Sequence, residues 1–157
     1  MPQKTNNIHG VSKMTKLDLF INYKGSIEDI AREISTLLGI ELTKDIDDFG
    51  ENYMFRFLEI EFVLYGNHGL EDDCGIVFSD YDYEMQMIKL RSGEKYRHYD
   101  EMYEKMAMFL MEKLAKALDS NVMLVDKLQT LVSKIDAVQQ SGSVVRIAAS
   151  PASVSSY

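Results

Sequence analysis

The sequence predicts an α+β, or mixed α/β, fold in which one long and one or two shorter helices pack on a mainly antiparallel central sheet. Its 157 residues, 46% of them hydrophobic, are enough for one domain with a buried core. Two segments repeat apolar residues with helical period. Between and after them, runs rich in strand formers lie at 17–23, 53–65, 83–90 and 122–125. This order of elements is typical of helices packed on one sheet.

The first predicted unit is a strand followed by a helix. Residues 17–23 are aliphatic and aromatic, and Gly25 ends the strand. Ser26 is placed to cap a helix, with Asp29 three residues later as in a capping box. Gly39 is well placed just beyond the last turn. The apolar residues between the two ends form one buried stripe, which consists of Ile30, Ala31, Ile34, Leu37 and Leu38.

Residues 41–52 are acidic and irregular, and we expect a solvated loop there. Asp45, Asp47 and Gly50 superficially resemble a calcium-binding loop. In that alignment Arg56 stands where an EF-hand carries its bidentate glutamate. A calcium site is therefore not expected.

The middle of the chain predicts two adjoining strands, a loop and a further strand. Residues 53–65 alternate in two phases, and the change near Leu58 indicates a bulge or tight turn. The two sets are expected on opposite faces: Tyr53, Phe55 and Phe57 on one, and Leu58, Ile60, Phe62 and Leu64 on the other. Residues 70–81 form a loop, and 83–90 form the next strand.

The last part of the domain predicts a long helix, a strand and a short helix. Asp100 is placed to cap the long helix, which runs to about Leu118. Its four methionines are interpreted as core filling rather than as a binding groove. Residues 122–125 form a strand, and 127–135 are expected as a short helix. The core stripe of the long helix consists of Tyr103, Met106, Ala107, Leu110, Leu114 and Ala117.

Composition places the domain at residues 16–137. Residues 1–15 show no apolar periodicity and predict a disordered lead. Residues 138–157 are Ser, Ala, Val and Gly with no acids, and predict a flexible tail. A single cysteine, Cys74, excludes an internal disulfide. No apolar run approaches the roughly 20 residues of a membrane span, and no signal peptide is evident, so we expect a cytoplasmic protein.

The distribution of charge is the most informative feature for function. The chain carries 17 basic and 25 acidic residues, for a net charge of −8. Between Arg56 and Lys89 there is no lysine or arginine but there are eight acids, so the window accounts for the whole excess of negative charge. The same window holds Tyr65, Phe78, Tyr81 and Tyr83. Such a segment disfavours direct nucleic-acid binding and favours capture of a basic protein, because charge speeds encounter and tyrosines supply contact area. A solvated acidic face is the alternative.

Candidate chemistry is weak by comparison. His68 lies six residues before Cys74, but spacing alone does not indicate a nucleophile pair. Asp72-Asp73 with Asp80 and Asp82 could hold Mg²⁺, yet the window has none of the cations that phosphoryl chemistry also needs. Phosphate-binding and hydrolase motifs are absent from the sequence. We expect no enzyme, no catalytic residues, no metal and no cofactor.

The window also carries a resemblance. The run from Leu58 to Tyr65, then Asn67 to Asp73, then Phe78 to Glu84, is similar to small bacterial immunity proteins. These are partners of contact-dependent growth inhibition toxins and related polymorphic toxins. The long helix followed by Val122–Asp126 is similar too, so the resemblance covers residues 16–136.

The resemblance implies an acidic, cytoplasmic, non-enzymatic protein that binds a toxin domain, often a nuclease, and blocks its active site or substrate groove. Together with the charge it predicts a toxin-binding surface in the acidic loop and the following strand. Its expected residues are Glu71, Asp72, Asp73, Asp80, Tyr81, Asp82, Tyr83 and Glu84. In this interpretation the acids supply the field, and Tyr81, facing outward, and Tyr83 supply anchors. The alternative is an adaptor or chaperone-like module that uses a sheet edge or the methionine-rich helix.

Overall fold

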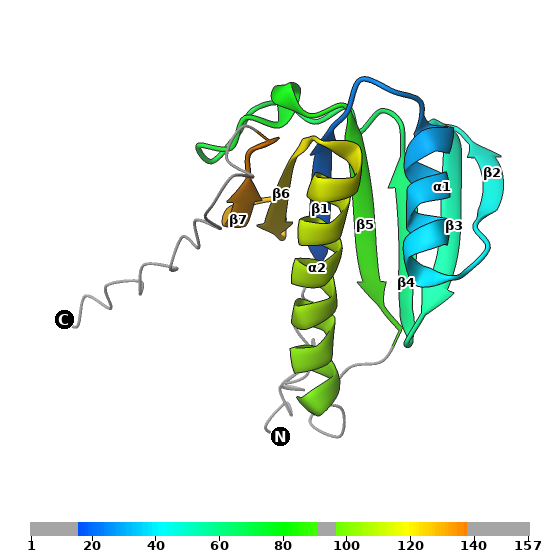
Figure 1. The fold of residues 1–157 in the computed structure, drawn as a ribbon. Helices are drawn as coiled ribbons and strands as arrows, with labels where there is room; N and C mark the ends of the chain where they lie inside the picture. The colour runs from blue at the N-terminus through cyan, green and yellow to red at the C-terminus, as the bar shows by residue number, and fades with distance from the viewer. Residues whose placement is uncertain (1–15, 91–96, 138–157) are drawn as a thin grey trace, which may run out of the picture.

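One seven-stranded antiparallel sheet, with two helices on one face, forms the structure (Figure 1). It is a computed structural model, and it describes residues 16–90 and 97–137, so the expected lead and tail lie outside the described residues. The predicted fold class is confirmed. In chain order the elements are β1 (Leu17–Asn22), α1 (Ile27–Leu38), β2 (Thr43–Asp47), β3 (Gly50–Phe57), β4 (Ile60–Tyr65), the 3₁₀ turn Phe78–Asp80, β5 (Tyr83–Lys89), α2 (Arg97–Leu118), β6 (Asn121–Asp126) and β7 (Thr130–Ile135).

The strand order is β2-β3-β4-β5-β1-β6-β7, so the N-terminal strand β1 lies inside the sheet. It pairs with β5 on one side and β6 on the other. Leu19 stands opposite Met85 and Leu124, and all three side chains point toward the helices. Because alternate residues of a strand face opposite ways, Asp18 and Phe20 lie on the far face. Both faces of β1 are buried, as its nearly continuous apolar sequence indicates.

Helix α1 forms as the sequence predicts. Ser26 Oγ accepts a hydrogen bond from Asp29 N at 3.2 Å, and Asp29 Oδ2 accepts one from Ser26 N at 3.2 Å. Gly39 ends the helix with φ 64°. Ile30 and Ile34 are fully buried against the sheet.

The predicted break near Leu58 is a two-residue hairpin turn. Leu58 and Glu59 both have positive φ, 50° and 59°, which is the conformation that tight hairpins require. Phe55 stands opposite Phe62 in the register, and the two rings stack at 4.4 Å. The two sets of apolar residues on either side of the turn were expected on opposite faces, and this is wrong. Residues directly opposite each other in an antiparallel pair share a face, and the two turn residues bring the two sets into this pairing. Leu58 itself is 47% exposed.

Two further expectations are wrong. Residues 41–52 contain β2 and the start of β3 rather than only a loop, and β2 is an edge strand exposed along its whole length. It therefore lacks the apolar alternation that would reveal it. Residues 127–135 are not a helix: Lys127 and Leu128 turn with positive φ, and β7 follows, paired with β6 through a bulge. The bulge inserts one extra residue into β7 and interrupts the two-residue alternation of a strand. The apolar residues of this segment are therefore spaced as in a helix.

Helix α2 lies across β1 and β6 beside α1 (Figure 1). It begins at Arg97, three residues before the expected cap, and Asp100 instead binds Lys89 Nζ at 2.7 Å. Tyr103 attaches it to the sheet: its hydroxyl donates to Met87 O at 2.6 Å and accepts from Leu17 N at 2.8 Å. The expected stripe is buried except for Met106, which is half-buried, and Ala117, which is exposed. Met111, Ala115 and Leu118 complete the face that contacts the core.

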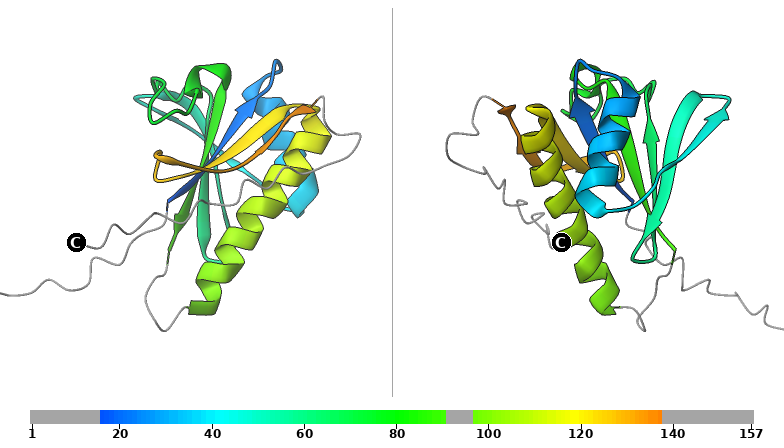
Figure 2. Two further views of the ribbon diagram at one scale, coloured as in Figure 1. Left: turned by 90° about the vertical axis from the view of Figure 1, so that its left-hand side faces the viewer. Right: turned by 45° about the vertical axis from the view of Figure 1, so that its right-hand side comes forward.

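The far face of the sheet has its own, smaller core. The loop at residues 66–82 covers the β1–β6 side of that face, away from both helices (Figure 2). The Phe20 ring lies edge-on to Phe78 at 5.0 Å and to His68 at 5.4 Å. The loop is thus a packed cover. The buried members of this core are Phe20, Ile76, Phe78, Tyr81, Met123 and Val125.

Candidate protein-binding surface

Five of the predicted acids are exposed on this loop. They are Glu71, Asp72, Asp73, Asp80 and Asp82. Within the described residues the one salt-bridge contact to this group is from Lys24 Nζ to Asp82 Oδ2, at 3.8 Å with both side chains largely solvated. A pair so exposed adds little stability. The loop therefore presents a concentrated negative charge to solvent, as the sequence predicts.

The loop is held in one conformation by its own hydrogen bonds. Asp72 accepts from Ser79 N at 2.8 Å and from Ser79 Oγ at 3.0 Å. Asp73 and Ile76 exchange backbone hydrogen bonds of 3.2 and 2.8 Å around a tight turn. At this turn Cys74 and Gly75 have φ of 51° and 74°. Such ordering lowers the entropy cost of binding a partner.

His68 anchors the loop rather than activating Cys74. Its Nε2 lies 2.7 Å from Tyr81 O, and its Nδ1 accepts from Leu70 N at 3.0 Å. A carbonyl can only accept, so Nε2 donates to it and Nδ1 is the acceptor of the ring. Both ring nitrogens are thus engaged by the backbone, and Cys74 is exposed at the turn. No nitrogen of His68 is left to serve as a general base.

The expected tyrosine anchors are not where the sequence suggested. Tyr81 was predicted to face outward, but it is 6% exposed and belongs to the far-face core. Burial, and then the nearby charges of Asp136 and Asp80, raise the pKa of its hydroxyl to about 12. Tyr83 is half-buried and donates to Gly25 O at 2.5 Å. Glu84 is only 4% exposed, so it adds little to the solvated acidic surface.

Glu84 instead lies in a pocket beside the loop, on the half of the far face that the loop leaves open. The pocket has a volume of about 130 Å³, and its walls are Phe49, Tyr65, Asn67, His68, Glu84 and Gln86. These residues come from the β2–β3 turn, the end of β4, the loop and β5. Long-range pairing of β4 with β5 brings Tyr65 opposite Glu84.

Asp18 lies on the same face as this pocket, directly opposite Gln86 in the β1–β5 pair. It is fully buried, and neither carboxylate oxygen has a hydrogen-bond partner among the described residues. Lys16 Nζ approaches Oδ1 only to 3.8 Å. Burial, opposed by Lys16 and reinforced by Glu84 and Asp126, raises the pKa of Asp18 to about 7. Burial likewise raises the pKa of Glu84. The one sequence signal for this group is an acid within the apolar run of β1.

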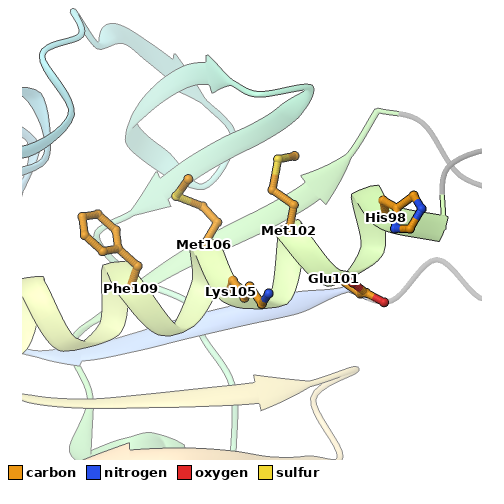
Figure 3. Close-up of a pocket in the computed structure, with 6 residues that line it drawn as sticks. All are labelled: His98, Glu101, Met102, Lys105, Met106 and Phe109. Carbon is orange, nitrogen blue, oxygen red and sulfur yellow. The ribbon is translucent and has the colours of Figure 1, made fainter.

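A second concave surface lies along α2. His98, Glu101, Met102, Lys105, Met106 and Phe109 enclose about 300 Å³ of open groove. Figure 3 shows Met102, Met106 and Phe109 directed to the same side of the helix. The sequence analysis interprets the methionines of this helix as core filling. Because Phe109 is 40% exposed, this face of the helix is partly open to solvent.

No family model, no curated protein and no solved structure matches this chain. In the described part of the chain, no group of three or more His, Cys, Asp or Glu side chains is arranged to hold a metal ion. Across residues 16–90 and 97–137, neither helix combines the length and the apolar character needed to cross a bilayer.

Proposed function

We propose that this protein is an immunity protein that binds and neutralises a basic toxin domain, with a nuclease as the favoured target. The observation that carries the proposal is the group of five exposed carboxylates on the ordered loop, with Lys24 the one described base in salt-bridge range. We expect stoichiometric binding that blocks an active site or substrate groove, in the cytoplasm.

The choice of a nuclease target follows from its electrostatics. An enzyme that grips phosphates is basic in its cleft. An acidic protein surface can imitate the charge of that substrate and steer association. Because Phe78 of the loop packs on Phe20 of β1, the carboxylates of the loop keep a fixed spacing. A fixed spacing favours recognition of one partner surface.

The proposal is tested by charge reversal. Asp80→Lys with Asp82→Lys should weaken binding to the toxin domain encoded next to this gene by about tenfold or more, mainly by slowing association. Glu104→Lys with Glu112→Lys changes net charge equally on an exposed part of α2 and is the matched control. Binding is measured by surface plasmon resonance, and inhibition by a nuclease assay. Equal losses in the two double variants, or no loss in either, would reject the loop as the toxin-binding site.

The groove on α2 favours a second candidate function, an adaptor or chaperone-like module. A methionine-lined surface can adapt its shape to different apolar partners. Phe109→Ser should abolish capture of such a partner but leave toxin binding intact. An adjacent gene that encodes no secreted toxin would favour this alternative over an immunity protein.

A further inference from the structure

The open half of the far sheet face carries two carboxyl groups that lie largely below the solvent surface. Glu84 is 4% exposed and accepts a single long hydrogen bond, from Gln86 Nε2 at 3.4 Å. A carboxylate has about four acceptor positions, so most of this capacity is unused. Asp18, fully buried on the same face of the neighbouring strand, has no hydrogen-bond donor among the described residues. A buried carboxyl group with unused acceptor positions is costly, and a bound donor would satisfy it.

The surroundings of the pocket strengthen this charge. Burial, and then the charges of Asp47, Glu84 and Glu61, raise the pKa of Tyr65 in the pocket wall. Near these acids, Arg56 is already paired with Glu61 at 2.8 Å, and Lys16 approaches Asp18 only to 3.8 Å. The backbone engages both ring nitrogens of His68 in the pocket wall. With the Glu84 carboxyl in its wall, the pocket favours a cation over an anion.

The walls of the pocket favour a particular cation. Phe49 is 78% exposed at the β2–β3 turn, where Asp47 Oδ1 fixes its backbone by accepting from Phe49 N at 2.8 Å. Together with the half-buried Tyr65 it provides aromatic surface beside the carboxylate. A guanidinium is planar, weakly hydrated and able to stack on aromatic rings while it donates to a carboxylate. An ammonium is more strongly hydrated and presents no flat face, so arginine fits better than lysine.

We propose that this pocket receives an arginine side chain of the basic protein partner. The guanidinium donates to the Glu84 carboxylate and to Gln86 Oε1, and Phe49 and Tyr65 flank it. The volume of about 130 Å³ is several times the roughly 15 Å³ that a single water needs, so the pocket is larger than a single hydration site. The identity of the partner rests on the proposed function; the presence of the pocket does not.

The pocket also supplies the anchor that the acidic loop lacks. Tyr81, the expected anchor, is buried in the far-face core. The loop carboxylates are solvated, so they contribute mostly to the rate of encounter. A desolvated arginine is the kind of contact that holds a complex together and slows its dissociation. The loop and the pocket then have separate kinetic roles.

The test uses small probes and the intact chain. N-acetyl-arginine amide is titrated into ¹⁵N-labelled protein, and the signals of the Gln86 side-chain amide and the Asn67 backbone are followed. The citrulline analogue, which is neutral and of the same shape, is the control probe. We expect saturable shifts with arginine, and at least about tenfold weaker binding for citrulline and for the variant Glu84→Gln. Phe49→Ala, at an exposed position, should weaken binding about threefold without affecting the fold.

Failure of the pocket can be told apart from failure of the proposed function. Equal binding of arginine and citrulline, or an affinity unchanged by Glu84→Gln, overturns the pocket, even where charge reversal at Asp80 and Asp82 still weakens toxin binding. Arginine binding that depends on Glu84, in a protein that does not inhibit the adjacent toxin, supports the pocket and rejects the immunity role. Asp80→Asn, as a loop control, should leave the affinity for the arginine probe unchanged.

Discussion

Replacing the buried Asp18 by Asn should change how the stability of the domain depends on pH. Asparagine has nearly the same shape as the protonated carboxyl and does not titrate. Asp18 is fully buried without a hydrogen-bond partner among the described residues. Its pKa in the folded protein, about 7, lies above the ordinary value of 3.8. Between these two pH values the carboxyl is mostly protonated in the folded protein and mostly ionised in the unfolded chain.

The sign and size of the effect follow from this difference. Between the two pKa values the folded state binds more protons, so the free energy of unfolding falls as pH rises. The destabilisation attributable to Asp18 is absent below pH 3.8 and levels off above about pH 7. Integrated between the two values, it is about 1.7 kcal/mol at pH 5 and about 4 kcal/mol at pH 8. Asp18→Asn should recover about these amounts.

The assay is urea unfolding at several pH values from 4 to 8. The sequence contains no tryptophan, so circular dichroism is the appropriate signal. The stability gain of Asp18→Asn over the unmodified protein should grow by about 2.5 kcal/mol between pH 5 and pH 8. Asp80→Asn, at an exposed position, should stay within about 0.5 kcal/mol of the unmodified protein throughout. A gain that does not grow with pH would show that Lys16, at 3.8 Å, keeps Asp18 ionised, and would refute the reasoning.

Two further changes probe the scaffold. Tyr103→Phe should lower the free energy of unfolding by about 2 to 3 kcal/mol, because it leaves Leu17 N–H and Met87 C=O buried without their 2.8 and 2.6 Å hydrogen bonds. Thermal unfolding measures this loss. A loss below about 0.5 kcal/mol would contradict the role of Tyr103 as an attachment between helix and sheet. Replacing Leu58-Glu59 by Asn-Gly should raise the free energy of unfolding by about 1 kcal/mol, since both positions have positive φ. Placing the same pair at Asp126-Lys127, where only one position has positive φ, should not stabilise the domain.

Local patterns were sufficient for much of the fold. The capping box at Ser26, the apolar stripe of α1 and the strands around the Leu58 turn were predictable because neighbours in the chain determine them. The acid-rich character of the loop was equally visible, and its charges are indeed exposed. Elements whose signal depends on remote packing were missed: β2 is exposed on both faces, and β7 has its period broken by a bulge.

The candidate site was likewise predictable from the sequence only in part. Composition alone locates the excess acid between Arg56 and Lys89. Only the tertiary structure decides that Tyr81 points inward and that Glu84 lines a pocket. It also decides that Asp18, on the neighbouring strand, has no hydrogen-bond partner among the described residues. The physical reason is that the exposure of a side chain depends on which distant surface covers it. Here the loop folds back on β1 and β6, and the pairing of β4, β5 and β1 gathers acids that lie far apart in the sequence.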